Sequence, residues 1–284
     1  KSNFTGLLSV YPWNIMGKRI LLYGLIFAVS CAMLPGVRKV PLTGRSQLNL
    51  IDEQEINALS FKEYQKVLGE SKVLTGGPQA AMVQKVGLRI QRAVETYFRE
   101  QNNADYLTHY RWEFNLIDDS KTANAWCMPG GKVAFYTGIL PITADEAGLA
   151  VVMGHEIAHA IANHGNERMS QTLAMQKISG GIAGVISNDP EKASQIFMGA
   201  LGIGVLLPFS RSNESEADYM GLMFMSMAGY NPEHAPLFWE RMLKYTNGGG
   251  TPQFLSTHPS HETRIANLKK WLPEARKYYR PGGS

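Results

Sequence analysis

The chain has 284 residues, of which 44% are hydrophobic and 18% are charged, enough for one large domain or two small ones. Its net charge of +4 is mild and its basic residues form no block, so we infer no nucleic-acid partner. With only two cysteines, Cys31 and Cys127, the chain is not a protein built on a framework of disulfides.

The segment from Met16 to Cys31 has the arrangement of a secretory signal peptide. Two basic residues form its start, and a short apolar core then ends in small residues before the cysteine. Residues 28–31 resemble a bacterial lipoprotein processing site, although Ala28 stands where leucine is usual. If the site is used, Cys31 becomes the lipidated first residue and anchors the chain to a membrane. The alternative is an uncleaved anchor helix with an incidental cysteine.

The residues that follow are typical of a tether leaving a membrane, because residues 33–47 hold two prolines and two glycines. We therefore expect a leader, anchor and tether over residues 1–47 and one folded domain over residues 48–280. Apolar side chains at helical spacing then predict helices over residues 53–70 and 79–101.

Three short strands are predicted next, over residues 110–117, 125–128 and 132–136, and together they indicate a small antiparallel sheet. An edge strand of such a sheet can pair with the backbone of a peptide. Asn124 could offer its amide to that backbone or to an oxyanion, and the alternative is a turn residue. Cys127 is expected to be a packed thiol.

The stretch from Gly154 to His159 predicts a metal site on a helix. Thr143 and Glu146 have the spacing of a capping box, which would start the helix there. His155 and His159 are four residues apart, so both imidazoles can point at one tetrahedral zinc ion. Glu156 stands beside them and can take a proton from a zinc-bound water.

The third zinc ligand must come from elsewhere in the chain. One class of zinc proteases uses a histidine six residues after the second, but Gly165 stands there, so that class is excluded. His164 lies about 180° round an unbroken helix from His155, so we expect it at the surface or as a cap. A carboxylate from a second helix is the remaining solution.

Residues 166–208 lie between the two parts of this predicted site and are rich in Met, Ala and Gly. Helices are expected over residues 169–186 and 193–207, with a break around Pro190. The apolar run of residues 196–207 is too short to span a bilayer. We interpret the region as a packed core hairpin, with a flap at the membrane or a lid over the cleft as the alternative.

The best source of the third ligand is the segment of residues 210–218. Asn213 could cap a helix there. Glu214 and Asp218 are four residues apart, so Glu214 could bind the metal while Asp218 accepts the free N–H of a ligand histidine. Glu216 points about 200° away from Glu214 and is expected in solvent or in a salt bridge. The alternative is an acidic first turn favoured by the helix dipole.

Two further helices are expected toward the carboxyl end. Asn231-Pro232 starts one of them, and the other begins at Pro259 and ends around Trp271-Leu272-Pro273.

Four stretches together resemble one family: HEIAH at residues 155–159, SRSNESEAD at 210–218, STHPS at 256–260 and NAWCMPGGK at 124–132. The chain resembles the zinc metalloendopeptidases that include HtpX, the CAAX prenyl endopeptidases and the OMA-type proteases. It is closest to the OMA-type and periplasmic lipoprotein branch. The resemblance implies a mostly helical α+β zincin fold over the catalytic domain.

The resemblance also implies roles for single residues. His155, His159 and Glu214 would bind one zinc ion per chain, with Glu156 as general base and Asp218 behind the ligands. His258 and Arg264 would lie near the zinc and stabilise the oxyanion. The alternatives are a helix cap for His258 and a structural salt bridge to Asp218 or Glu262 for Arg264.

The implied function is hydrolysis of peptide bonds in misfolded or membrane- and envelope-associated proteins, with protein or peptide substrates as partners. A zinc hydrolase acting on another bond and an assembly factor with a mostly closed zinc site are the alternatives. The start of the chain favours a periplasm-facing lipoprotein of the bacterial envelope, and the domain also fits a mitochondrial location.

Overall fold

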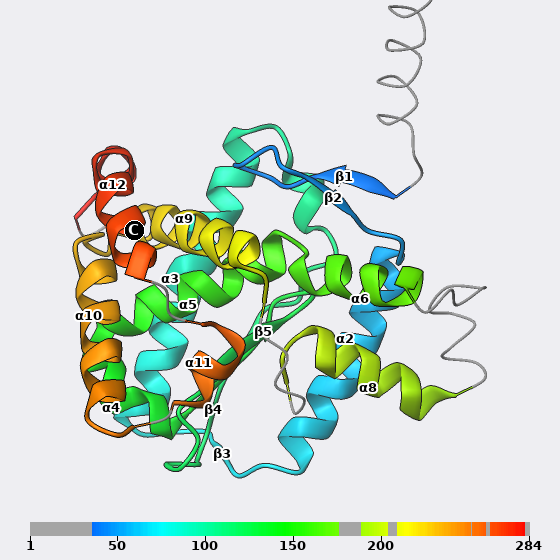
Figure 1. Ribbon diagram of the computed structural model, residues 1–284, viewed down its shortest axis with the longest axis horizontal. Helices are drawn as coiled ribbons and strands as arrows, with labels where there is room; N and C mark the ends of the chain where they lie inside the picture. Colours follow the sequence, from blue (N-terminus) through cyan, green and yellow to red (C-terminus); the bar gives the residue numbers. More distant parts are fainter. Residues whose placement is uncertain (1–35, 176–188, 204–208, 251, 260–261, 282–284) are drawn as a thin grey trace, which may run out of the picture. The chain divides into compact units, whose positions relative to one another are not determined.

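The computed structural model describes residues 36–175, 189–203, 209–250, 252–259 and 262–281 (Figure 1). The chain divides into a unit of residues 1–37 and a compact unit of residues 38–284, and the second is described here. The predicted signal segment and Cys31 lie outside the described residues, so lipidation stays a prediction. The expected domain boundary at residue 47 also stays a prediction.

The larger unit is mainly helical, as predicted for an α+β protein. Its helices are α2 (Glu53–Gly69), α3 (Pro78–Glu100), α4 (Leu140–Thr143), α5 (Glu146–Ile161), α6 (His164–Met175), α8 (Pro190–Ala200), α9 (Arg211–Met227), α10 (His234–Asn247), α11 (Gln253–Thr257) and α12 (Glu262–Tyr278). The strands are β1 (Val37–Lys39), β2 (Ser46–Leu48), β3 (Val73–Leu74), β4 (Glu113–Ile117), β5 (Ala125–Met128) and β6 (Lys132–Tyr136). Within the described ranges, none of the helices is both long enough and apolar enough to cross a bilayer.

The main sheet has the strand order β3-β4-β6-β5 and is mixed rather than antiparallel throughout. A tight turn with both Gly130 and Gly131 at positive φ joins β5 to β6, so these two strands are antiparallel. Strand β6 then lies between β5 and β4 and runs parallel to β4, with Glu113 opposite Lys132. Edge strand β5 borders helix α5.

The sheet separates two hydrophobic clusters, because successive side chains of a strand point to opposite faces. Val133 and Phe135 of β6 join a large cluster with α3, α5, α9, α10 and α12. Ala134 of β6 and Trp126 of β5 join a smaller cluster with α2, α6 and α8. The described helices of the region 166–208, α6 and α8, thus each bury one face in this smaller cluster, and the expected hairpin between them stays a prediction. Residues 176–188 and 204–208 lie outside the described part.

Helix α5 is buried from Gly148 to its end and lies against α9 (Figure 1). The approach is closest at two glycines: a Cβ added to Gly154 would lie 2.8 Å from the carbonyl oxygen of Gly221. A Cβ added to Gly221 would lie 2.7 Å from the backbone nitrogen of His155. Both distances are shorter than a side-chain carbon tolerates, so the sequence lets the two helices, and the side chains they carry, come close.

Several predicted helix ends differ in the structure. Helix α6 begins at His164 rather than at residue 169, α8 covers Pro190–Ala200 rather than residues 193–207, and α10 begins at His234 rather than at Asn231. Helix α5 is capped by Asp145, whose Oδ1 accepts the N–H of Gly148 at 2.7 Å, whereas Thr143 ends α4. Helix α9 is capped by Ser210 rather than Asn213. Helix α12 continues through Pro273 to Tyr278, although a proline removes one backbone hydrogen bond, and Ala275 beyond it is buried.

Candidate metal centre

Four buried side chains from three helices converge on one point. His155 and His159 come from α5, Glu214 from the first turn of α9, and His258 from the end of α11. Each offers one nitrogen or oxygen, and these atoms all lie within 4.8 Å of one another. The side chains of the four residues are at most 4% exposed. The convergence of the two histidines and Glu214 is the arrangement that the sequence predicts.

The spacing of these atoms fits a tetrahedral zinc ion. His159 Nε2 lies 3.1 Å from His155 Nε2 and 3.3 Å from Glu214 Oε1, and His258 Nδ1 lies 2.9 Å from Glu214 Oε1. Ligands about 2.1 Å from a tetrahedral zinc lie about 3.4 Å from one another. Histidine nitrogens and one carboxylate oxygen are also the donors that zinc accepts.

The electrostatics favour the protonation states that a metal needs. Burial lowers the pKa of His155 and of His159 well below the usual value, so both imidazoles are neutral and can offer a lone pair. Burial alone would raise the pKa of Glu214. The neighbouring His258 and Arg264 together outweigh burial and hold that pKa well below its ordinary value, so Glu214 is a carboxylate.

Glu156 of α5 lies beside the four convergent side chains but is not one of them. Its Oε1 lies 3.4 Å from His258 Nε2 and is buried without a hydrogen-bond partner. Burial raises the pKa of Glu156 to about 7, against the lowering effect of His258. A carboxyl group with a pKa near neutrality is suited to taking up and returning a proton.

Asp218 and Arg264 stand behind His155. Asp218 Oδ1 lies 3.0 Å from His155 Nδ1, one turn of α9 below Glu214. Arg264 of α12 donates from Nη2 to Asp218 Oδ1 at 2.7 Å, and its Nη1 lies 3.0 Å from Glu214 Oε2. Its guanidinium also lies 3.5 Å over the Trp239 ring. Burial raises the pKa of Asp218 to about 6 although Arg264 opposes this shift.

His258 lies among the donors themselves, within reach of the point where its expected oxyanion role would place the substrate oxygen. Its Nδ1 is 3.2 Å from His155 Nε2, so it is a fourth member of the cluster rather than a neighbour. Burial lowers the pKa of His258, but Glu214 and Glu156 outweigh burial and raise the pKa above its usual value. No periodicity links His258 to α5 or α9, so only the His-Pro pair marks it in the sequence.

His164 and Glu216 are not where the sequence predicts them. His164 is fully buried, with Nδ1 2.8 Å from His159 Nδ1 and Nε2 3.0 Å from Glu216 Oε2. The expectation of a surface position for His164 was wrong because the helix is not continuous: α5 ends at Ile161, and Asn163 has φ +54°. Glu216 is buried in a salt bridge, the second of its two predicted environments.

The two remaining sequence-predicted residues lie beside β5. Asn124 is buried, and its Oδ1 accepts the N–H of Ala125 at 2.9 Å, so its carboxamide is engaged with its own strand. Cys127 is a buried free thiol, as expected, and burial raises its pKa.

Aromatic rings close the cluster from the side of α9 and α11. The Phe209 ring lies 4.3 Å from the His159 ring and 5.4 Å from the His258 ring, measured between centroids. Phe209 is held beside α11 by its N–H, which donates to the Thr257 carbonyl at 3.0 Å. The Phe254 ring stacks on His258 from the other side.

The chain is similar to known peptidases. The model of "Peptidase family M48" matches residues 85–272, which include all the convergent side chains. The mitochondrial metalloendopeptidase OMA1 of Schizosaccharomyces pombe is 35% identical over 83% of this chain and 66% of its own length. The Saccharomyces cerevisiae protein of the same name is 32% identical over 85% of this chain and 70% of its own.

A bacterial relative is more distant. The beta-barrel assembly-enhancing protease of Escherichia coli is 28% identical over 56% of this chain and 34% of its own length. The chain thus spans about two thirds of the two yeast relatives and about one third of the bacterial one. Because the family model covers more than half of the chain and a relative above 30% identity is matched over 70% of its length, the chain belongs to peptidase family M48.

Proposed function

We propose that the chain is a zinc-dependent metalloendopeptidase in which His155, His159 and Glu214 hold one zinc ion. Membership of the family implies a divalent metal, and the named relatives are metalloendopeptidases or a protease. The single observation that carries the proposal is the convergence of two neutral imidazoles of α5 with one carboxylate of α9. Neither a non-peptidase hydrolase nor a pure assembly factor finds support in these relatives.

Zinc bound at this point supplies a Lewis acid that polarises the scissile carbonyl and makes water acidic. Glu156 takes the proton of the attacking water as the new carbon–oxygen bond forms. It then gives the proton to the amine nitrogen as the carbon–nitrogen bond breaks. A pKa near 7 suits both steps, because the carboxyl group must accept and release a proton in one cycle.

We assign supporting roles to the other residues of the cluster. His258 lies within reach of both Glu156 and Glu214 and stabilises the negative charge that develops on the substrate oxygen. For Arg264, the contacts support the structural ion pair with Asp218, because its donors are already directed at Asp218 and Glu214. Asn124 stays a proposed contact for the substrate backbone at edge strand β5.

The test of the mechanism is a Glu156→Gln variant. It should bind zinc as the parent does and lose proteolysis of an unfolded, alkylated protein substrate, because a carboxamide takes up no proton. The matched control is Glu63→Gln, which makes the same change at a buried glutamate of α2. Cleavage by the Glu156→Gln variant at the parent rate contradicts the base assignment. Turnover of simple esters or amides without cleavage of any peptide contradicts the endopeptidase.

We further propose substrates among misfolded or membrane-associated proteins, and a location in the bacterial envelope with Cys31 as lipid anchor. The lipoprotein-like segment of residues 16–31 supports this location. The relatives named mitochondrial favour the alternative. Mass spectrometry of the mature amino terminus decides: an acylated Cys31 as first residue supports the envelope, and an unmodified cysteine within a longer chain opposes it.

A further inference from the structure

A continuous path of buried polar contacts runs from His159 to the amino-terminal part of the compact unit. His159 Nδ1 lies 2.8 Å from His164 Nδ1, and His164 Nε2 lies 3.0 Å from Glu216 Oε2. Glu216 in turn accepts hydrogen bonds from Arg45 Nε at 2.7 Å and from the hydroxyl of Thr43. Three of these side chains are more than nine-tenths buried.

The protons on this path can be placed by elimination. His159 Nε2 faces the donor cluster and must keep its lone pair to hold a metal, so His159 Nδ1 carries the proton. His164 Nδ1 therefore accepts a hydrogen bond from His159. The other nitrogen of His164 then carries a proton and donates to the Glu216 carboxylate, which only accepts. Each group has one role, and every contact in the path is satisfied.

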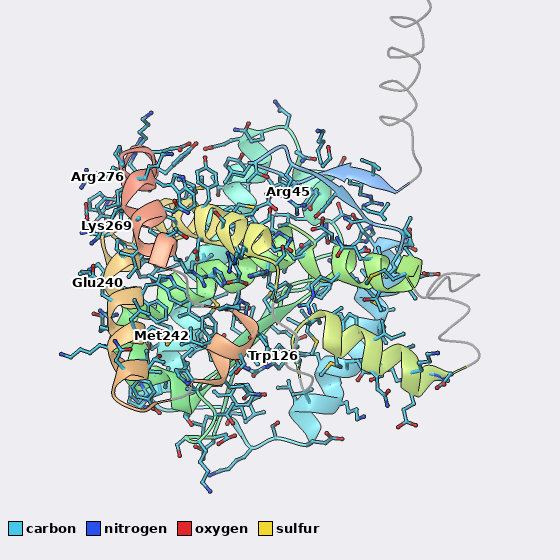
Figure 2. All side chains as sticks on the ribbon, in the orientation of Figure 1. Arg45, Trp126, Glu240, Met242, Lys269 and Arg276 are labelled. Carbon is cyan, nitrogen blue, oxygen red and sulfur yellow. The ribbon has the colours of Figure 1, made fainter. Side chains whose placement is uncertain are left out.

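Arg45 fixes the outer end of the path. Figure 2 labels Arg45, which belongs to the segment between β1 and β2. Its Nη1 and Nη2 each lie 2.8 Å from a carboxylate oxygen of Glu167 on α6, while its Nε donates to Glu216 on α9. Such bidentate pairs add directional order as well as charge. Glu167 also accepts from Asn213 Nδ2 at 3.0 Å, next to Glu214. One guanidinium thus ties α6 to the helix that carries the carboxylate donor.

We propose that His164 and Glu216 are positioning residues that set the tautomer of His159, and that Thr43 and Arg45 hold this relay from the amino-terminal segment. The inference rests on the proposed zinc site. Carboxylates behind a ligand histidine commonly raise metal affinity by about 10- to 100-fold. Here the Glu216 carboxylate does not contact the ligand histidine directly. It orients His164 through one ring nitrogen, and the other ring nitrogen of His164 orients His159.

The test compares zinc dissociation constants, measured by competition with a chromophoric chelator. His164→Leu removes the acceptor for His159 Nδ1–H and should weaken zinc binding about 10- to 100-fold. His164→Asn can place an amide oxygen where Nδ1 stands and should recover most of the affinity. Glu216→Gln keeps the shape of the side chain but not its charge. Its zinc dissociation constant should lie between those of His164→Leu and His164→Asn.

The matched control is Lys132→Met, which breaks the partly buried ion pair with Glu113 away from the relay. It should lower the melting temperature of the metal-free protein and leave the zinc dissociation constant unchanged. Nitrogen-15 spectra of histidine in metal-free protein give a second readout, in which His159 should show one Nδ1–H tautomer in the parent and a mixture in His164→Leu.

Three outcomes overturn the relay. In the first, His164→Leu binds zinc as tightly as the parent. In the second, Lys132→Met weakens zinc binding as much as Glu216→Gln does, which would indicate general destabilisation. In the third, the tautomer of His159 does not change in His164→Leu. If instead the parent binds zinc and His159→Ala does not weaken binding, the proposed zinc site itself fails.

Discussion

The two histidines of α5 are each linked to a buried carboxylate, one by direct contact and the other through a second histidine. His155 meets Asp218 directly, and Arg264 pairs with that carboxylate. His159 meets Glu216 only through His164, and the pairing arginine is Arg45. Each side therefore consists of a histidine, a carboxylate and an arginine, but the His159 side contains one more imidazole.

The two sides also differ in depth. The Arg264 side chain is 3% exposed and belongs to α12, whereas the Arg45 side chain is 27% exposed and belongs to the segment between β1 and β2. The His155 side is thus part of the central core. The His159 side reaches the surface of the compact unit. A buried charge that loses its ion-pair partner destabilises a protein more than an exposed one does. Removing the arginine should therefore lower the free energy of unfolding more on the His155 side.

The largest effect is expected from Arg264→Leu. This change leaves Asp218 and Glu214 buried without their cation and removes the contact with the Trp239 ring. Breaking a buried ion pair from one side costs about 3–5 kcal/mol. Urea unfolding of the metal-free protein measures the loss. A loss below about 1 kcal/mol would contradict the stronger dependence on an arginine that is expected on the His155 side.

A smaller effect is expected from Arg45→Met. Glu216 and Glu167 lose a shared partner, but solvent reaches the position and screens the remaining charges. We expect a loss of about 1–2 kcal/mol in metal-free protein. We also expect zinc affinity about 10-fold weaker, at the lower end of such effects. If the variant is as unstable as Arg264→Leu, the two sides do not differ in depth as described.

The sequence predicted well what depends on a single unbroken helix. His155 and His159 lie on one face of α5, and Glu214 and Asp218 lie on one face of α9, because residues four apart coincide after one turn. The mostly helical α+β class was implied by the family resemblance, and the helical spacings of the apolar residues agree with it. The residues that bring α5 and α9 together, Gly154 and Gly221, carry no such pattern.

Counting residues per turn gave a wrong position where the helix ends. Counting turns on an unbroken helix placed His164 on the side away from His155, but the helix breaks at residues 162–163, where Asn163 has positive φ, and His164 contacts His159. Glu216 does point away from Glu214, yet that face of α9 is covered by Thr43 and Arg45 rather than by water. The contacts of distant segments, such as residues 43–45, have no signal in helical periodicity.

The smallest expected effect tests that turn. Asn163 has φ +54°, a conformation that costs a side chain with a Cβ about 1–2 kcal/mol and costs glycine little. Asn163→Ala and Asn163→Gly both lose the bond from Asn163 Nδ2 to the Tyr106 hydroxyl, so their difference isolates the backbone. We expect the alanine variant to be less stable by about 1 kcal/mol in urea unfolding, after the entropy of glycine in the unfolded chain is allowed for.

The zinc affinities of these two variants should differ by less than about 3-fold. Helix α6 is held independently of the turn, because Glu167 pairs with Arg45 and Met169 is buried. Equal stability of the two would mean that the backbone relaxes at residue 163. A large loss of zinc affinity in the alanine variant alone would mean that the turn, rather than Arg45, places His164 beside His159.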